Sequence, residues 1–174
     1  MTSLTPTEIL RDEHRIILRG LELLERAAAR RPVDAWWADT VAWLRTFADQ
    51  SHHAKEETAL FPAMVKAGVP SEGGPITVML EEHEEGRRLI RTLEASTGAT
   101  RVMACRAYVS LLRAHIDKEN EIVFPLADAV LDERALHELR RAFDTVELEQ
   151  GARATSAGAD AALARLATAL DAAV

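Results

Sequence analysis

The stretch HHAKEETALFP, residues 52–62, recurs in outline later in the chain as HIDKENEIVFP, residues 115–125. Each copy begins with His and carries Lys three residues later, Glu four residues later, and Phe-Pro nine and ten residues later. On a helix, side chains four residues apart lie on the same face. Each copy therefore predicts a helix that presents one His and one Glu as a two-ligand clamp for a metal ion.

A second repeated feature precedes each clamp: two acidic residues followed by His, in Asp12-Glu13-His14 and in Glu81-Glu82-His83. Each half of the chain thus reads as one helix with such a His followed by one helix with a clamp. Two hairpins of this kind, packed about a pseudo-twofold axis, would bring four imidazoles and two carboxylates together in the core. The six predicted metal ligands are His14, His52, Glu56, His83, His115 and Glu119.

The first clamp has an ambiguity of register, because His53 and Glu57 have the same spacing as the pair before them. Their counterparts in the second copy are Ile116 and Asn120, and this pair cannot bind a metal. The repeat therefore favours the register that starts at the first His of the stretch. We expect His53 and His137 to lie at the surface or behind the ligands.

The donor set limits the metal. Imidazole and carboxylate without thiolate suit iron, manganese or zinc. If both Glu side chains bridge two metals, each metal has two His nitrogens and two Glu oxygens, and octahedral iron still takes about two more ligands. A shared oxo, hydroxo or water ligand would supply one of these. The sequence therefore predicts a bridged di-iron centre with one open position per metal, although zinc and manganese would accept the same ligands.

The rest of the chain reads as helical. Ala, Leu, Glu and Arg dominate, and aromatic residues make up 5%. Thr5-Pro6-Thr7-Glu8 is typical of a capping box, and Arg31-Pro32 marks the end of the helix that it begins. Pro62 and Pro125 fall inside helical patterns and predict a kink or an end of regular helix there. The further helices are expected at about 34–66, 75–98, from 100 through the second clamp, and 132–151. Asp34 is the expected N-cap of the first of these, Gly68 is the expected residue after its end, and the last is expected to follow Asp132.

These elements predict an all-α fold, an up-down-up-down four-helix bundle with an extra C-terminal helical segment. We expect residues 1–150 to form the metal-binding bundle and residues 151–174 to form an Ala-rich tail. The tail has a weak apolar stripe at Leu163, Leu166 and Leu170.

Composition excludes several classes of function. The net charge of −7 gives no electrostatic basis for binding nucleic acid. No apolar run approaches the ~18 residues of a transmembrane helix, and the N-terminus has no secretory pattern. The single Cys105 excludes an intramolecular disulfide. We therefore expect a cytoplasmic protein with no membrane partner, as a monomer or a weak homodimer.

The chain resembles the hemerythrin-like, HHE cation-binding family over residues of about 8 to 150. The matching pieces are Glu13-His14-Arg15, the clamp and Phe-Pro at 52–62, Glu82-His83 with Gly86-Arg87, and the clamp and Phe-Pro at 115–125. The resemblance implies a four-helix bundle around a non-haem di-iron centre with the six residues above as ligands. Ferritin-like proteins instead use Glu-x-x-His, a spacing absent from this chain.

One departure from the family bears on function. Oxygen-carrying hemerythrins have a fifth His four residues after the His of the third helix, and here that position is Arg87. The resemblance then implies a more symmetric and more open site, like the bacterial branch linked to nitric oxide, peroxide and repair of iron centres. Those repair proteins usually have an added N-terminal domain with cysteines that this sequence lacks, so the resemblance does not assign repair.

Two side chains are candidates for supporting roles. Arg87 is either an anion-binding partner inside the site or a surface arginine. Tyr108 is either a hydrogen-bond donor behind the ligands or an ordinary core residue. Gly86 could leave room beside the metals for a small ligand.

Three hypotheses about function follow. The first is a di-iron protein that binds or reacts with O2, NO or peroxide. The second is a di-iron oxidase or oxygenase with an organic substrate. The third is a non-catalytic iron-responsive or oxygen-binding protein. The sequence leaves open whether the protein is an oxidoreductase.

Overall fold

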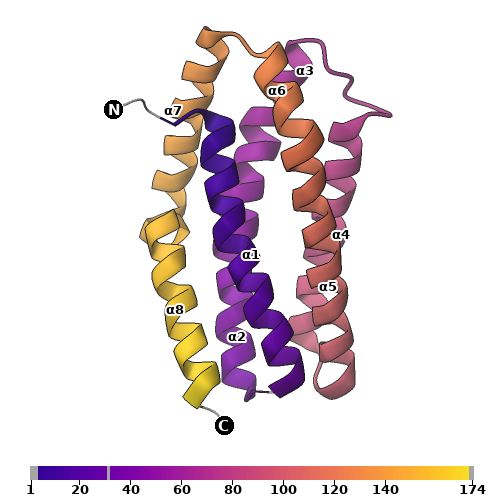
Figure 1. The fold of residues 1–174 in the computed structure, drawn as a ribbon, viewed down its shortest axis with the longest axis vertical. Helices are drawn as coiled ribbons and strands as arrows, with labels where there is room; N and C mark the ends of the chain where they lie inside the picture. The colour runs from indigo at the N-terminus through magenta and orange to yellow at the C-terminus, as the bar shows by residue number, and fades with distance from the viewer. Residues whose placement is uncertain (1–3, 31, 173–174) are drawn as a thin grey trace.

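The computed structural model describes residues 4–30 and 32–172, and Figure 1 shows long helices that lie lengthwise against one another. The all-α prediction is confirmed, and the described residues contain no strand. The α-helices are α1 (Pro6–Arg30), α2 (Asp34–Trp43), α3 (Phe61–Lys66), α4 (Pro75–Ala95), α5 (Gly98–Lys118), α6 (Phe124–Val130), α7 (Glu133–Gln150) and α8 (Ser156–Ala172). π-Helical stretches at Leu44–His53, Glu56–Leu60 and Glu119–Val123 continue α2 into α3 and α5 into α6, and a 3-10 turn at Ala152–Ala154 precedes α8.

The helix ends follow the predicted capping chemistry. The Thr5 backbone N–H donates to Glu8 Oε2 at 2.7 Å, and the Glu8 N–H donates to Thr5 Oγ1 at 3.2 Å, which is a reciprocal capping box. Asp132 caps α7 by accepting from a backbone N–H at 2.8 Å. Gly68 follows α3 with φ +100°, as the glycine that ends a helix commonly does.

The start of α2 differs from the expectation that Asp34 caps it. The helix begins at Asp34 itself, and Val33 precedes it without a side-chain cap. The Asp34 carboxylate instead accepts from Arg101 Nη1 at 2.6 Å, an ion pair with another helix. Arg31, proposed to end the preceding helix together with Pro32, lies outside the described residues.

Both internal prolines follow a π-helical turn, in the same way in each half of the chain. Pro62 and Pro125 lie in the first turns of α3 and α6. The N–H of the Phe before each proline donates to the backbone carbonyl five residues earlier, which belongs to Glu56 or Glu119. A proline lacks an N–H and clashes with the carbonyl of the preceding turn, so a wider turn relieves the conflict. The helices thus continue through both prolines, and the widened turns begin at the two clamp carboxylates.

The apolar core forms two layers along the bundle. The larger layer contains the three Trp residues of α2, the second half of α1, the second half of α4, most of α5, and α8. The smaller layer contains Leu10, the Phe-Pro regions of both clamps, the start of α4, and Leu139 and Phe143 of α7. Five of the six predicted metal ligands fall in the sequence gaps between these two layers, and His115 lies at the edge of the larger layer, next to Ile116. The polar cluster therefore lies across the middle of the bundle with apolar packing on both sides.

The C-terminal helix α8 packs on α1 and α2 (Figure 1). The predicted stripe of Leu163, Leu166 and Leu170 is buried in the larger apolar layer. The indole N–H of Trp36 donates to the Leu166 carbonyl at 2.9 Å, and that of Trp43 donates to a second α8 carbonyl at 3.1 Å. The segment thus shares a core with the bundle.

Within the described ranges, no helix combines the length and the apolar character needed to cross a membrane.

Candidate metal centre

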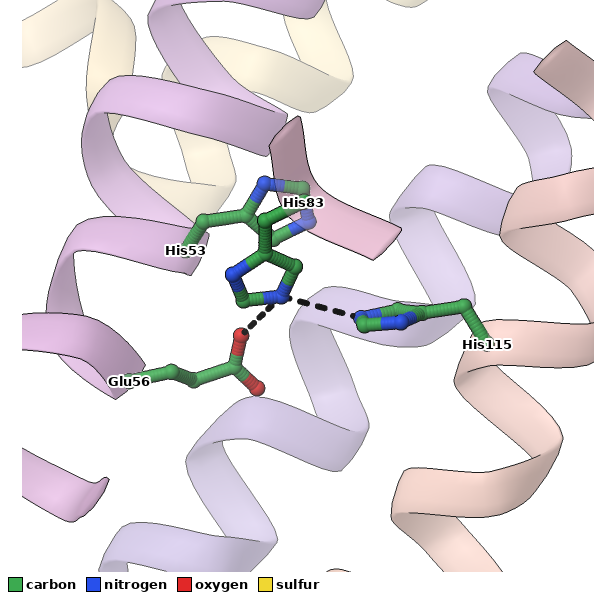
Figure 2. Close-up of side chains that lie close together, drawn as sticks. All are labelled: His53, Glu56, His83 and His115. Atoms are coloured by element: carbon green, nitrogen blue, oxygen red, sulfur yellow. Dashed lines mark hydrogen bonds and ion pairs between the residues drawn. The ribbon is translucent and has the colours of Figure 1, made fainter. Parts of the chain in front are cut away.

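All six predicted ligands converge in the middle of the bundle, each at most 1% exposed. His14 comes from α1 and His83 from α4, while the two clamps run through the π-helical segments. Figure 2 shows Glu56, His83 and His115 pointing toward one another from three separate segments. The two hairpins therefore bring together the residues that the sequence repeat grouped.

The Glu56 carboxylate lies between the two hairpins. Its Oε1 is 3.5 Å from His52 Nε2, and its Oε2 is 3.5 Å from His83 Nε2. One oxygen thus faces a His of the first hairpin and the other faces a His of the second.

The Glu119 carboxylate repeats this arrangement from the opposite side. Its Oε2 is 3.1 Å from His14 Nε2, and its Oε1 is 3.2 Å from His115 Nε2. Two half-sites result, each with two imidazoles and one oxygen from each carboxylate. The first half-site contains His14 and His52, and the second contains His83 and His115. The rings of each pair have centroids 4.7 Å apart and planes at 59°, so the halves match closely.

The outer nitrogen of each imidazole is held by a side chain from another helix. His52 Nδ1 is hydrogen-bonded to Glu13 Oε2 at 2.8 Å, and Lys55 donates to the other oxygen of Glu13. Lys55 is fully buried and also donates to Glu147 Oε1 on α7 at 2.7 Å. Helix α7 is thus joined through two ion pairs of Lys55 to Glu13, which holds the His52 side chain.

The second half-site contains the same chain of contacts. His115 Nδ1 is hydrogen-bonded to Glu82 Oε2 at 2.9 Å, and Lys118 donates to Glu82 Oε1. Here the Lys side chain is 36% exposed and has no counterpart to the α7 contact among its described hydrogen bonds. In both halves, therefore, the acidic residue before the His of α1 or α4 holds the clamp His, and the clamp Lys pairs with that acidic residue. The sequence repeat contained these residues but did not indicate this role.

The remaining two imidazoles are held by the residues that follow each clamp Glu. His83 Nδ1 is hydrogen-bonded to Glu57 Oε1 at 2.7 Å, and His14 Nδ1 is hydrogen-bonded to Asn120 Oδ1 at 3.0 Å. Each Nδ1–H donates outward to an oxygen, so in a neutral ring the Nε2 lone pair faces the centre. Metal-bound histidines are commonly oriented in this way.

The centre contains acceptor atoms that face one another. Both oxygens of Glu56 and of Glu119 are buried without a hydrogen-bond partner among the described residues, as is His14 Nε2. Burial, and then the charge of Glu119, raise the pKa of Glu56 well above its ordinary value. A buried carboxylate pair with no donors is costly, and metal ions would satisfy every one of these atoms. The donor set therefore fits a pair of metals.

The two imidazoles of the second half-site also favour a bound cation. His83 Nε2 and His115 Nε2 are 3.0 Å apart, and the outer nitrogen of each ring already donates to a carboxylate (Figure 2). Burial acts to lower the pKa of His115, but Glu119 and Glu82 outweigh it and raise that pKa. A proton on His115, or a cation between the two nitrogens, is therefore needed to offset their repulsion.

His53 was expected either at the surface or behind the ligands, and its burial excludes the surface. It is 4% exposed, and its ring stacks on His83 with centroids 3.9 Å apart. Its ligand atom lies within 4.8 Å of those of Glu56, His83 and His115. Neither of its ring nitrogens has a hydrogen-bond partner among the described residues. The second half-site thus contains a third imidazole, and the expected symmetry is incomplete. His137, by contrast, is exposed.

Arg87 lies behind His83 rather than at the centre. Its Nη2 donates to Glu57 Oε1 at 2.6 Å, and its Nε donates to Asp49 Oδ1 at 2.8 Å. Glu57 Oε1 is the atom that accepts from the outer nitrogen of His83. Arg87 therefore neutralises Glu57, which holds His83, and Asp49, which faces His53, a role that neither sequence alternative described.

Tyr108 and Gly86 lie beside each other, since a Cβ on Gly86 would be 3.7 Å from the Tyr108 ring. Tyr108 is 1% exposed, and its hydroxyl has no hydrogen-bond partner among the described residues. It is therefore a free donor in the interior.

Comparison with known proteins also indicates a cation-binding domain. The family model for the hemerythrin HHE cation-binding domain matches residues 5–127. The iron-sulfur cluster repair protein YtfE of Escherichia coli O81 (strain ED1a) is 37% identical over a 90-residue alignment that covers 44% of this chain and 40% of that protein. The YtfE proteins of Escherichia coli O1:K1 / APEC and of Escherichia fergusonii are 36% identical, and these matches also cover 44% of this chain and 40% of each relative. The match thus spans less than half the length of these relatives. No solved structure matches the chain.

Proposed function

The chain belongs to the hemerythrin HHE cation-binding family, and we propose that it holds two iron ions between His14, His52, His83 and His115, bridged by Glu56 and Glu119. We propose further that this centre binds or reacts with a small ligand: O2, NO or peroxide. When bound, such a pair of irons supplies a Lewis-acidic binding place and electrons for the ligand. Zinc and manganese remain the competing metals, since they accept the same donors.

One observation carries the proposal: each carboxylate directs one oxygen to each half-site. Glu56 faces His52 and His83, while Glu119 faces His14 and His115, at 3.1–3.5 Å. A single-metal site has no need for two carboxylates that both span two pairs of imidazoles. The arrangement therefore supports a dinuclear site.

The residues around this site orient its ligands and exclude water from it in the absence of a metal. The outer hydrogen bonds fix the tautomer and the orientation of four imidazoles, which raises their basicity as ligands. The apolar layers on both sides exclude bulk water from the centre, and a low local dielectric strengthens every interaction between charges there. A small uncharged ligand can enter such a site at less cost than an ion.

The first test is metal content and the optical spectrum of freshly purified protein. We expect two irons per chain and an absorption band from a bridged ferric pair. Glu119→Ala should lose both irons, whereas Glu121→Ala, which removes an exposed carboxylate two residues away, should keep them. One metal per chain, or zinc in place of iron, would refute the di-iron proposal.

The second test concerns reactivity. The reduced protein is mixed anaerobically with O2, NO or peroxide, one ligand at a time, and followed by optical and EPR spectroscopy. We expect a spectral change with at least one ligand in the wild type and none in Glu119→Ala. No change with any of the three would refute reactivity with small ligands while leaving the metal site intact.

The free hydroxyl of Tyr108 supports a role as donor to a ligand bound at the centre. A hydrogen bond from a hydroxyl contributes about 0.5–1.5 kcal/mol, or up to roughly tenfold in affinity. Tyr108→Phe should therefore weaken the ligand by several-fold without loss of iron. If Tyr108 only fills the core, the variant should instead bind the ligand unchanged and be as stable or more stable.

A second candidate function comes from the name of the matched relatives, iron-sulfur cluster repair protein. On this alternative the centre would supply iron to damaged clusters. The test is transfer of radioactive iron from the loaded protein to an apo iron–sulfur protein. Transfer no faster than from free ferrous iron would count against it.

The hypothesis of an organic substrate gains no support from two cavities of the described residues. These cavities, each of about 550 Å³, lie between α3 and α7 and between α2 and α8. Their linings contain none of the six proposed ligands. An oxidase or oxygenase would need such a space beside the metals.

A further inference from the structure

A metal ion needs a polar path to the buried centre. The proposed ligands are each at most 1% exposed, and apolar layers pack on both sides of them. Burial of a charge without compensating partners is costly, so an ion cannot cross those layers as a small neutral molecule can. The polar side chains that connect the ligands to solvent therefore indicate where a cation approaches.

Such side chains occur where the π-helical stretches of the first clamp face α4. The Glu57 side chain is 25% exposed, and its Oε1 accepts from His83 Nδ1 at 2.7 Å. The Asp49 side chain is 21% exposed, and its Oδ1 is 3.6 Å from Nδ1 of the buried His53. Each carboxylate thus contacts solvent on one side and a buried imidazole on the other.

The repeat shows that this polar face has no charged counterpart beside the first half-site. The face is formed by four residues: Asp49, His53, Glu57 and Arg87. The equivalent positions of the repeat are Leu112, Ile116, Asn120 and Leu18. The three aliphatic side chains among these pack in or against the larger apolar layer. A cation therefore meets carboxylates at one face of the centre, and the equivalent positions of the other face supply none.

His53 distinguishes the polar face from an ordinary cluster of surface ion pairs. Its side chain is buried, and neither ring nitrogen has a hydrogen-bond partner among the described residues. Figure 2 shows the ring beside that of His83, and the two ring planes are 16° apart. Because the rings are nearly parallel, their in-plane lone pairs do not converge on one metal ion. His53 is thus a free nitrogen donor between the carboxylates of the polar face and the centre.

Arg87 occupies the place of a cation at this face. Its Nε donates to Asp49 Oδ1 at 2.8 Å, and its Nη2 donates to Glu57 Oε1 at 2.6 Å. Its remaining nitrogen, Nη1, is 3.9 Å from Oε2 of Glu84, an exposed carboxylate one turn earlier on α4. The guanidinium therefore has a second partner nearer to solvent, to which it can turn when it leaves the two inner carboxylates.

From these contacts we propose that Asp49, Glu57 and His53 form a capture site for divalent metal ions on their way to the centre, with Arg87 as its gate. The inference rests on the proposed metal centre and goes beyond it. While Arg87 pairs with the two carboxylates, it neutralises them and fills the position of a metal ion. When Arg87 turns to Glu84, the carboxylates and the free nitrogen of His53 receive the ion. The capture site holds the ion in transit only, and the centre keeps its six ligands.

The test is the rate of zinc uptake by the metal-free protein, followed by stopped-flow with a coloured chelator that competes for zinc. Arg87→Ala should speed uptake and release by roughly tenfold, since two partly exposed ion pairs are each worth up to several-fold in an equilibrium. Because the same passage serves both directions, the affinity should change less than either rate. Arg88→Ala is the matched control. It removes an exposed arginine of the same helix, paired with Glu85, and should leave the rates unchanged.

A second substitution tests the capture of the ion. Asp49→Asn, added to Arg87→Ala, should slow uptake by several-fold, because carboxylates at an entrance raise the local concentration of cations. General loosening of the fold would instead make the double variant the faster of the two. Arg87→Gln replaces the Ala variant if that variant does not fold.

The outcomes separate the capture site from the metal centre. Uptake by Arg87→Ala that is no faster than uptake by Arg88→Ala would overturn the capture site. Uptake by the double variant that is no slower than uptake by Arg87→Ala would also overturn it. A wild type that binds fewer than two metals would instead overturn the proposed function.

Discussion

Replacement of Lys55 by Met should strongly destabilise the metal-free protein, whereas Lys118→Met should not. The two lysines occupy the same place in the repeat, and each donates to the carboxylate that holds a clamp His. Lys55 is fully buried between Glu13 and Glu147, while the Lys118 side chain is 36% exposed. Met retains most of the apolar length of Lys, so the comparison isolates the loss of charge.

The expected magnitude follows from the fate of Glu13, which is fully buried. Removal of one partner from a buried ion pair costs roughly 3–5 kcal/mol. The carboxyl can limit this cost by taking up a proton. Since its ordinary pKa is 4.5, protonation at pH 7 costs at most about 3.5 kcal/mol, at about 1.4 kcal/mol for each pH unit. We therefore expect a loss of about 3 kcal/mol for Lys55→Met and of about 0–1 kcal/mol for the exposed pair of Lys118.

The loss should also depend on pH. Without Lys55 the pKa of Glu13 in the folded state rises further above the unfolded value, so stability falls as pH increases. At pH 5.5 protonation costs only about 1.4 kcal/mol, and the loss should shrink to about that value. Urea unfolding of the metal-free variants, followed by circular dichroism at pH 7.0 and 5.5, measures both effects. Equal losses for the two lysines, or a Lys55→Met loss below about 1 kcal/mol at pH 7, would refute the reasoning.

Three further predictions concern other parts of the chain. Gly20→Ala should destabilise the protein by about 1–3 kcal/mol, because the added Cβ would overlap the Trp43 ring. Gly86→Ala has room for the added methyl group and should stabilise the protein by about 0.5–1 kcal/mol, since Gly86 lies in a helix interior. Thermal unfolding that ranks the two variants the other way would contradict this prediction. Burial, and then the charge of a neighbouring imidazole, lower the pKa of His53 from 6.5 to about 3. The metal-free protein should therefore lose stability as pH falls from 6.5. His53→Gln should reduce the slope of unfolding free energy against pH by about 1.4 kcal/mol per pH unit, and an unchanged slope in urea titrations between pH 4 and 6 would argue against this. Burial raises the pKa of Glu56, and a carboxyl group binds a metal in its deprotonated form, so zinc affinity should increase with pH. Affinities that are equal at pH 5.5 and 7.5 would oppose this assignment.

The sequence predicted the parts of the fold that depend on local chemistry. The capping box at Thr5, the cap at Asp132 and the glycine at Gly68 are each local patterns with one favoured backbone geometry. The gathering of the six side chains could also be predicted, because the same spacing occurs twice and two like hairpins pack most simply about a twofold axis. Whether those side chains bind metal stays a proposal.

The sequence repeat gives little information where the two halves differ. It set His53 aside because Ile116 stands at the equivalent position, which assumes that both halves have the same backbone. The π-helical stretch of Leu44–His53, which turns consecutive histidines to one side, has no recognisable sequence pattern of its own. Contacts between helices were equally hidden, such as Glu57 and Asn120 beside His83 and His14, since they depend on how hairpins pack rather than on spacing within one helix.

The ion pair between Lys55 and Glu147 gives α7 a direct connection to the centre. The family match ends at residue 127, and α7 begins at Glu133, beyond that match. A binding partner that displaced α7 would take one carboxylate from Lys55, and the remaining attraction would shift toward Glu13, which holds His52. In the opposite direction, a movement of the His52 ring would shift Glu13 and Lys55 and so change the ion pair of Lys55 with Glu147 on α7. The position of α7 is in this way coupled to the state of the buried centre.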